Sequence, residues 1–415
     1  MLKRLVIENY RSCVRTSLDL SPSVSVLIGP NGSGKTNILQ SIMLLSRLTQ
    51  RGDTLGRFAK GGSSRIRASF QVGRGTADLN IAFDPARSEM AEYTSLGASQ
   101  KWVLKAQNGS QVSLDVPLAF PAVFGSDWTG AQVRRHYYLR IAATAGKGHL
   151  RKKQTPQEIP LWAARMMVRV AAFCGGVKYY SATQFTNPLS CPPSFEIQES
   201  GQQRTLSTRG LSRVLYDMYS AEQSRKDDRF DRFIDIVGPH GLGLIDRVTF
   251  QRVRTSSASY SVRVGGKLEV RKRNRLLIIP RFKIGRLVLS PNQLSEGTFK
   301  TLALLFHVIT EDSPALLIEE PEVCVHHGLL SSILELIKSH SQRRQVIIST
   351  HSDYVLDHVK PESVYAVSFD KKAGTSVRHI TKTMSPKELV ALREYLARDG
   401  NLGDYWREGA LEDRP

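Results

Sequence analysis

A glycine-rich stretch near the N-terminus limits, more than any other segment, what this chain can fold into. Gly29 to Thr36 reads GPNGSGKT, and it follows the apolar run Val24 to Ile28. Asn37 to Leu45 comes next, with apolar residues at helical spacing. A strand, a glycine-rich loop ending in Gly-Lys-Thr and a helix, in this order, are typical of a phosphate-binding loop. The sequence therefore predicts an α/β protein built around such a loop.

The loop also indicates which residues bind phosphate. Its backbone N–H groups, at the start of a helix, form a concave site for an anion. We expect nucleotide contacts from the loop and the residue that follows it: Gly29, Pro30, Asn31, Gly32, Ser33, Gly34, Lys35, Thr36 and Asn37. The Lys35 ammonium is expected to reach the β- and γ-phosphates as a catalytic cation, and the Thr36 hydroxyl to ligate Mg²⁺. The predicted cofactors are therefore ATP and Mg²⁺.

Two later segments place polar residues directly after buried strands. In SPALLIEEPE, Glu319 and Glu320 follow the apolar run Ala315 to Ile318. In RRQVIISTHS, Ser349, Thr350 and His351 follow the strand-like run Gln345 to Ile348. Ligands of open α/β sheets bind at such strand ends. We expect Glu319 to hold Mg²⁺ and Glu320 to polarise the attacking water, because neighbouring strand residues point in different directions. His351 is expected to contact the γ-phosphate. An exposed acidic turn and a core histidine are the alternatives.

The positive charge of the chain is concentrated in its middle. The formal net charge is +20, and residues 101–286 contain 31 Lys and Arg against 13 Asp and Glu. Three runs place cations close together: Arg134 to Arg140, Gly146 to Gln154, and Glu269 to Arg275. Dense cations on one surface favour phosphate-backbone binding through counterion release. We expect DNA or another polyanion to bind residues 101–286, with a basic surface that only aids solubility as the alternative.

Four segments, in order, carry a resemblance to a known family. GPNGSGKT, LSEGTFKTLAL, LLIEEPE and IISTHS resemble the Walker A loop, signature motif, Walker B strand and switch histidine of ABC-type ATPases. The N-terminal strand leading into IENYRS, the wide gap before the signature and the EEPE sequence resemble the RecF/OLD-like branch, which includes SMC and Rad50 proteins. Within it, the chain resembles ATPase subunits of antiphage systems such as Septu and PARIS. This implies an α/β P-loop head with a mixed sheet flanked by helices.

The resemblance implies a dimer and further site residues. In ABC-type ATPases the signature turn contacts ATP held by a second subunit, so Ser295 and Gly297 are expected to complete the site in trans. A homodimer, or a higher oligomer built from it, follows. VKYYSATQ resembles the strand that ends in the family's Q-loop glutamine, which makes Gln184 a candidate for Mg²⁺ sensing, with a plain loop residue as the alternative. Glu319 departs from the aspartate usual in the family, and its extra methylene is expected to permit Mg²⁺ contact, usually through water.

Domain organisation follows from these placements. Strands carrying the loop, the acids and the histidine must share one sheet, so residues 1–185 and 280–370 are expected to form a split ATPase head. Residues 186–279 are expected to form an inserted, basic lid lobe of helices and strands, and residues 371–415 a C-terminal helical tail beginning with a capped helix near Ser385. No sustained heptad repeat indicates a long coiled coil.

Several classes of protein are disfavoured. No apolar run reaches the roughly 18 residues that span a bilayer, so we expect a cytoplasmic protein and no membrane partner. Only about 64 residues follow His351, too few for the Toprim domain of OLD-type nucleases, so nuclease activity in this chain is not expected. Four cysteines, Cys13, Cys174, Cys191 and Cys324, lack metal-ligand spacing and are expected to be free thiols.

Three functions are compatible with these features. The first is a defence-system ATPase that dimerises around ATP, senses a phage component or DNA, and controls a separate effector such as a nuclease or toxin. The second is a RecF-like repair or recombination ATPase that clamps duplex DNA. The third is a structural scaffold that holds ATP with negligible turnover.

Overall fold

A computed structural model gives the fold of most of the chain. It describes residues 1–50, 64–83, 98–116, 160–181, 188–198, 211–224, 228–262, 268–323, 325, 327–342, 344–398 and 400–407. The chain forms two compact units, each assembled from separate segments. Unit 1 contains Met1–Tyr179, Asp312–Glu319 and Ser341–Pro415, and unit 2 contains Tyr180–Glu311 and Glu320–His340.

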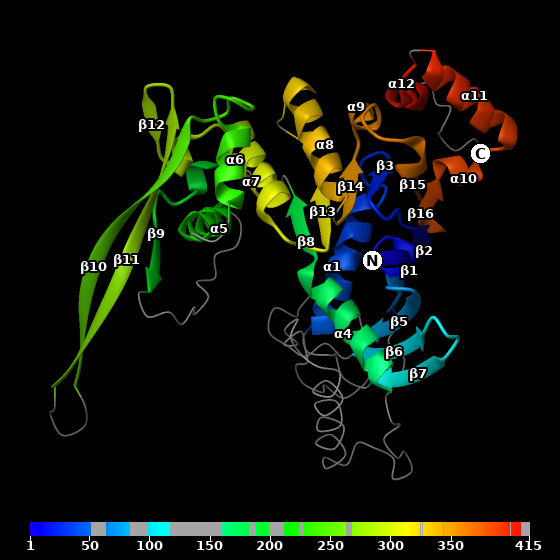
Figure 1. Ribbon diagram of the computed structural model, residues 1–415, viewed down its shortest axis with the longest axis horizontal. Helices are drawn as coiled ribbons and strands as arrows, with labels where there is room; N and C mark the ends of the chain where they lie inside the picture. The colour runs from blue at the N-terminus through cyan, green and yellow to red at the C-terminus, as the bar shows by residue number, and fades with distance from the viewer. Residues whose placement is uncertain are drawn as a thin grey trace, which may run out of the picture. The chain divides into compact units, whose positions relative to one another are not determined.

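A mixed six-stranded sheet forms the centre of unit 1 (Figure 1). Its strand order is β16-β15-β3-β14-β13-β8. The strands are β3 (Val24–Ile28), β8 (Lys178–Ser181), β13 (Ala315–Glu319), β14 (Gln345–Thr350), β15 (Val364–Asp370) and β16 (Gly374–His379). The strands β15, β3, β14 and β13 are parallel, whereas β16 is antiparallel to β15. The predicted α/β class with a mixed sheet is therefore confirmed.

A second sheet of unit 1 is entirely antiparallel, in the order β2-β1-β4-β5-β6-β7. Its strands are β1 (Leu2–Tyr10), β2 (Cys13–Asp19), β4 (Ser64–Val72), β5 (Gly75–Phe83), β6 (Ala98–Lys105) and β7 (Gln111–Val116). Alternate residues of β5 are buried, as expected for a sheet with one face on a core. This face packs in one hydrophobic cluster with residues of helices α1 (Lys35–Gln50) and α4 (Leu161–Gly176).

The helix after the glycine-rich loop packs as its spacing predicts. Ile38, Leu39, Ile42 and Leu45 of α1 are all at most 2% exposed. They belong to the same cluster as Leu27 of β3. Burial of four such side chains contributes roughly 1.5–3 kcal/mol each. The loop between β3 and α1 is thus held at both ends by elements fixed in the core.

The C-terminal region differs from the predicted helical tail. It begins with strand β16, whose residues pair in register with β15 from Asp370↔Gly374 to Tyr365↔His379. The expected helix does form as α11 (Pro386–Ala397), with Ser385 and Glu388 making a reciprocal capping box. Two short helices complete this region, α10 (Ile380–Thr383) and α12 (Leu402–Arg407). Two more, α9 (Asp353–Leu356) and η4 (Pro361–Ser363), precede β15. Residues 374–379 of the predicted tail are therefore part of the central sheet.

Unit 2 combines a four-stranded sheet with helices (Figure 1). Its long strands β10 (Arg247–Val262) and β11 (Leu268–Ile284) form a hairpin, and β9 (Phe195–Gln198) and β12 (Leu287–Leu289) pair with β11. The helices are η2 (Pro188–Ser190), α5 (Leu211–Gln223), α6 (Arg229–Val237), η3 (Pro291–Gln293), α7 (Glu296–Thr310) and α8 (His327–Ser341).

The boundaries of this lobe differ from the predicted insertion of residues 186–279. Helix α7 lies in unit 2, where its Phe306 ring contacts Phe233 of α6 at 5.4 Å between centroids. The helix is buried on nearly every side from Phe299 to Ile309. Among the described residues, no helix is both long and apolar enough to cross a bilayer.

Candidate nucleotide site

The register of the central sheet brings three predicted segments to one edge. Strand β14 lies between β3 and β13, with Thr350 opposite Ile28 and Ser349 opposite Glu319. Since these strands are parallel, their carboxyl ends meet at the same edge of the sheet. The glycine-rich loop, the acid at the end of β13 and His351 directly after β14 therefore emerge side by side in unit 1.

The glycines of the loop are required by its backbone and by its neighbours. Gly32 and Gly34 have φ values of +82° and +103°, a region that residues with a Cβ rarely adopt. A Cβ on Gly34 would lie 2.0 Å from Thr375 Oγ1, and one on Gly29 would lie 2.1 Å from the Val367 carbonyl oxygen. The loop thus packs closely against strands β15 and β16.

Three side chains brace the loop from outside it. The Asn37 amide donates to Ser12 Oγ at 2.6 Å, and Thr375 Oγ1 lies 2.7 Å from the same oxygen. The Thr375 hydroxyl also donates to the Ser33 carbonyl at 3.0 Å. Sequence reasoning did not identify Ser12 or Thr375. Ser12 belongs to the IENYRS segment, which was a usable signal, whereas nothing local marked Thr375.

Lys35 is held inside the loop. Its ammonium donates to the carbonyl oxygens of Gly29 at 2.7 Å and of Pro30 at 2.9 Å, and the residue is 6% exposed. These bonds fix the cation at the loop. The Ser33 hydroxyl is buried and has no hydrogen-bond partner among the described residues. A phosphate oxygen is the kind of acceptor that such a hydroxyl could serve.

Two hydroxyl groups, one of them from the loop, hold the Glu319 carboxylate. The Thr36 hydroxyl donates a hydrogen bond to Glu319 Oε1, and the Tyr179 hydroxyl donates one to Glu319 Oε2. Glu319 is only 7% exposed. A hydroxyl and a carboxylate in contact are oxygen ligands of the kind Mg²⁺ takes. Tyr179 was not anticipated, although it lies in the VKYYSATQ segment that drew attention to Gln184.

Glu320 and His351 lie at the ends of their strands, as the sequence indicates. Glu320 directly follows β13 and has φ +48°, an uncommon value for a residue with a long side chain. Such a conformation persists only where surrounding structure holds it, and it often accompanies function. His351 is exposed at the end of β14. Gln184, by contrast, lies outside the described residues.

The signature turn begins a helix of unit 2. Ser295 is the N-cap of α7, and its Oγ accepts from the Thr298 backbone N–H at 3.2 Å. Gly297 lies in the first turn. One turn further on, the buried Lys300 ammonium pairs with Glu296 at 2.6 Å. The exposed side of this turn carries the positive end of a helix dipole, which favours an anion.

The residues of unit 1 fit a magnesium nucleotide. The positive-φ glycines leave backbone room at the loop, the helix N-terminus and Lys35 supply positive charge, and Thr36 and Glu319 supply adjacent oxygen ligands. When bound, Mg²⁺ supplies charge neutralisation at the phosphates. The chain's own groups would position it: Lys35 and the loop amides would hold the phosphates, and Tyr179 would fix the Glu319 carboxylate.

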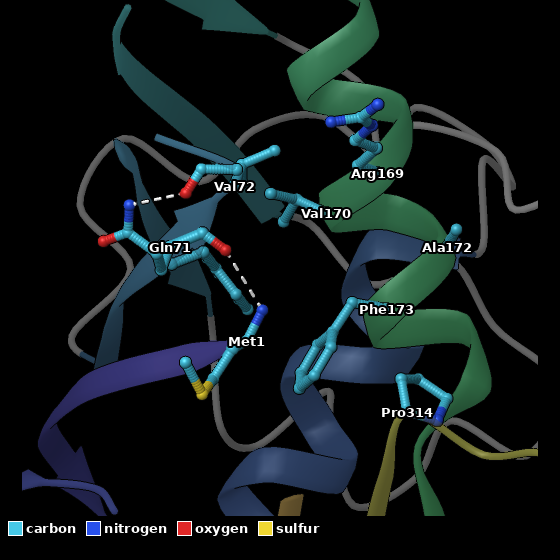
Figure 2. Close-up of a pocket in the computed structure, with 10 residues that line it drawn as sticks. Met1, Gln71, Val72, Arg169, Val170, Ala172, Phe173 and Pro314 are labelled. Atoms are coloured by element: carbon cyan, nitrogen blue, oxygen red, sulfur yellow. Dashed lines mark hydrogen bonds between the residues drawn. The ribbon is translucent and has the colours of Figure 1, made fainter. Parts of the chain in front are cut away.

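A separate hollow in unit 1 lies away from this edge. Figure 2 shows its lining, with Met1, Phe173 and Pro314 in the lower part of the view and Arg169 of α4 in the upper part. Its volume is about 370 Å³. Pro314 precedes β13, whereas Glu319 ends it, so the two are separated by five strand residues, roughly 17 Å. This apolar hollow is therefore distinct from the phosphate-binding edge.

Two family models match this chain, and together they contain the glycine-rich loop and the later motifs of the candidate site. Residues 1–97 match a family model described as "AAA ATPase domain", and residues 193–357 match one described as "AAA domain, putative AbiEii toxin, Type IV TA system". The first match contains the glycine-rich loop. The second contains the signature turn, Glu319, Glu320 and His351.

Individual relatives match the chain over part of its length or at low identity. The DNA replication and repair protein RecF of Lacticaseibacillus casei is 43% identical over 77 residues, which are 18% of this chain and 20% of that protein. The chain therefore matches only about a fifth of the length of this curated relative. An SMC head domain from Thermotoga maritima is 12% identical with a TM-score of 0.39, over 91% of this chain and 98% of that one. A Smc head domain with an extended coiled coil, bound to the C-terminal domain of ScpA from Pyrococcus furiosus, is 11% identical with a TM-score of 0.41, over 95% and 99%.

The site and these matches agree in part. The chain has a P-loop fold, two of its segments are similar to AAA ATPase domains, and a stretch of 77 residues is similar to RecF.

Proposed function

We propose that this chain hydrolyses Mg-ATP at the carboxyl edge of its central sheet and dimerises around the nucleotide. The observation that carries the proposal is the contact of Thr36 and Tyr179 with the two carboxylate oxygens of Glu319. It places two metal-type ligands against each other beside Lys35. Glu320 is proposed to polarise the attacking water, and His351 to contact the γ-phosphate.

The dimer is proposed from the signature turn. Ser295 and Gly297 open α7 with an exposed, positively polarised turn, which suits the phosphates of ATP bound by a second copy. In such an arrangement ATP would contact both subunits and hold them together. Gln184, which lies outside the described residues, is proposed to sense Mg²⁺, the role of the Q-loop glutamine in the family that the chain resembles.

A mass measurement tests this proposal. Glu320→Gln is expected to bind Mg-ATP without turnover, and its particle mass in light scattering is expected to double when ATP is added. Lys35→Ala is the matched blank and should remain unchanged by ATP. If Glu320→Gln keeps one mass with and without ATP, dimerisation around the nucleotide is wrong. If Glu320→Gln and the natural chain both form the dimer with equal, negligible turnover, the scaffold alternative is correct instead.

Within the cell, we propose a cytoplasmic role as sensor and regulator of an antiphage defence system with a separate effector, a nuclease or toxin. The support is the match of residues 193–357 to a family whose description names a toxin and a Type IV TA system. Cells that carry the gene in its native neighbourhood are expected to plate phage less efficiently than cells carrying Lys35→Ala. Equal plating across a broad phage panel would count against the defence role.

A RecF-like role in DNA repair is the second candidate, and the RecF-like segment favours it. Duplex DNA or another polyanion is then a proposed partner of the basic residues between 101 and 286. The test is the ATP turnover rate at about 150 mM salt with and without duplex DNA, with Lys35→Ala as the blank. A several-fold rise with DNA supports DNA coupling. An unchanged rate directs attention to a protein effector.

A further inference from the structure

The hairpin formed by β10 and β11 is the most strongly charged element of unit 2 among the described residues. Its two strands contain nine Lys and Arg residues and a single acid, Glu269. The other two basic runs noted in the sequence lie outside the described residues. The backbone of the third, Glu269 to Arg275, lies in β11, so the structure assigns at least one concentrated part of the positive charge to this hairpin.

The backbone register of the two strands pairs residues of different kinds. The distal half of β10 reads TSSASYS, and the paired part of β11 is rich in cations. In register, Ser257 lies opposite Arg273 and Ser259 opposite Arg271. Arginine, lysine and hydroxyl side chains are the groups that contact the phosphates of nucleic acids. The register thus places both kinds of residue at paired positions of one ribbon.

The base of the ribbon is anchored by aromatic packing. Phe250 of β10 contacts Tyr219 at 5.6 Å and Phe230 at 6.5 Å between ring centroids. The Arg252 guanidinium lies over the Tyr219 ring at 5.7 Å. Arg247 and Lys283 are exposed and lie opposite each other, so they share the face turned away from these helices. The base of the ribbon therefore also carries exposed cations.

Beyond this base the ribbon has only two strands. Strand β9 pairs with β11 only between Arg275 and Ile278, and β12 pairs only between Phe282 and Ile284. Strand β9 ends its pairing at Arg275, and beyond the pair Thr255↔Arg275 the hairpin runs seven residues, about 23 Å, to the pair Val262↔Leu268 with no third strand among the described residues. Figure 1 shows this part extending past β9. The major groove of B-DNA, about 12 Å wide, admits a two-stranded β-ribbon.

We propose that the β10–β11 hairpin is a DNA-binding arm that enters the major groove of duplex B-DNA. Phosphate contacts from its cations would position it, and its hydroxyl-rich strand would lie against the groove. Double-stranded RNA is a poorer partner, because its major groove is too deep and narrow for side chains to read. The arm lies within unit 2 and does not depend on the nucleotide dimer, so its test needs no ATP.

The test shortens the ribbon without changing its register. Removal of residues 256–261 and 269–274 takes six residues from each strand, which preserves the side-chain alternation and joins Thr255 to Val262 and Leu268 to Arg275. The deletion removes three cations and one acid. Lys371→Ser with Lys372→Ser, in the exposed turn between β15 and β16, is the control with the same net charge change. Circular dichroism and gel filtration establish that each variant is folded.

Fluorescence anisotropy with a 30-base-pair DNA, without nucleotide, measures affinity from 50 to 300 mM salt. The shortened chain is expected to bind DNA about tenfold or more weakly than the natural chain. Its plot of log affinity against log salt concentration is expected to be less steep by about 2.7, whereas both values should change little in the control. If the deletion does not fold, Arg271→Gln with Lys272→Gln and Arg273→Gln is expected to reproduce the loss. Three results would overturn the proposal: unchanged binding in the shortened chain, no DNA binding at 150 mM salt, or equal binding to double-stranded RNA or polyglutamate. ATP-driven dimerisation is measured separately, so failure of the arm is distinguishable from failure of the proposed ATPase function.

Discussion

The Thr375 hydroxyl donates a hydrogen bond of 3.0 Å to the backbone carbonyl of Ser33, 342 positions earlier in the chain. Thr375 lies at the start of the antiparallel edge strand β16 and is 1% exposed. Ser33 lies in the phosphate-binding loop. The C-terminal region therefore supports the conformation of a loop formed by the first forty residues.

Thr375→Val tests this support. Loss of the buried hydroxyl leaves the Ser33 carbonyl without this donor, and we expect a cost of about 1–3 kcal/mol in unfolding free energy. Nucleotide binding should weaken about fivefold to tenfold, because a loosened loop must be ordered on binding. Urea unfolding and titration with a fluorescent ATP analogue measure the two effects. Thr301→Val is the control: its buried hydroxyl has no hydrogen-bond partner among the described residues, so it should be neutral or stabilising. Equal effects of the two variants on stability would argue against the brace.

Gly34→Ala is expected to disrupt the loop through packing as well as backbone strain. The added Cβ would lie 2.0 Å from Thr375 Oγ1 and 2.8 Å from Ser12 Oγ, at a φ of +103°. Gly109→Ala is the matched control, since Gly109 has φ +83° and an added Cβ there would meet no other atom within 4 Å. The control should cost about 1–2 kcal/mol from strain alone. Thermal unfolding without nucleotide should show Gly34→Ala to be clearly less stable than the control, and similar stabilities would show that the contact with Thr375 is easily relieved.

Tyr179→Phe is expected to raise the Mg²⁺ concentration needed for half-maximal ATP turnover. The Tyr179 hydroxyl donates to Glu319, and without it the carboxylate loses one of the two bonds that orient it. A shift of about fivefold corresponds to about 1 kcal/mol. Tyr180→Phe removes a neighbouring hydroxyl that donates to the Lys300 carbonyl at 2.8 Å, and it should lower stability without changing the Mg²⁺ requirement. The role of Tyr179 is wrong if its variant shows the Mg²⁺ dependence of the natural chain.

Ser295→Ala separates helix capping from a role in the dimer. Loss of an N-cap serine costs about 1 kcal/mol. Ser385→Ala removes the equivalent cap of α11, where Ser385 Oγ accepts from Glu388 N–H at 3.3 Å. Both variants should lose similar stability. In the Glu320→Gln background, only Ser295→Ala is expected to weaken ATP-dependent dimerisation, measured by sedimentation. If both caps affect dimerisation equally, Ser295 acts only through the fold.

The described cysteines should be unreactive in the folded protein. Burial raises the pKa of Cys13, and it raises the pKa values of Cys174 and Cys191 to about 12. Since only the thiolate reacts, roughly one thiol in a thousand would be ionised at pH 9 for a pKa of 12. Iodoacetamide labelling resolved by peptide mass spectrometry should be slow at these positions between pH 7 and 9. It should become fast when guanidinium unfolds the chain. Rapid labelling of Cys174 in the native protein would contradict its burial.

Local patterns were sufficient for the elements that carry the candidate site. The strand Val24–Ile28, the helix after Lys35, and the strands before Glu319 and His351 all form where spacing indicated them. Each depends on short-range physics: apolar runs make buried strands, and glycines permit the loop backbone. Parallel pairing then forces their carboxyl ends to one edge. The roles assigned to these residues stay predictions.

Pairing between distant segments could not be read in the same way. The sequence identified the glycine-rich loop, the paired acids and the basic run of β11, because each of these motifs consists of residues that are adjacent in the sequence. Only the tertiary structure decided that Thr375 and Ser12 brace the loop, that Tyr179 holds Glu319, and that β16 belongs to the central sheet. These contacts join segments that are far apart in the sequence and lie close together only after folding. Burial then leaves each polar group few other hydrogen-bond partners.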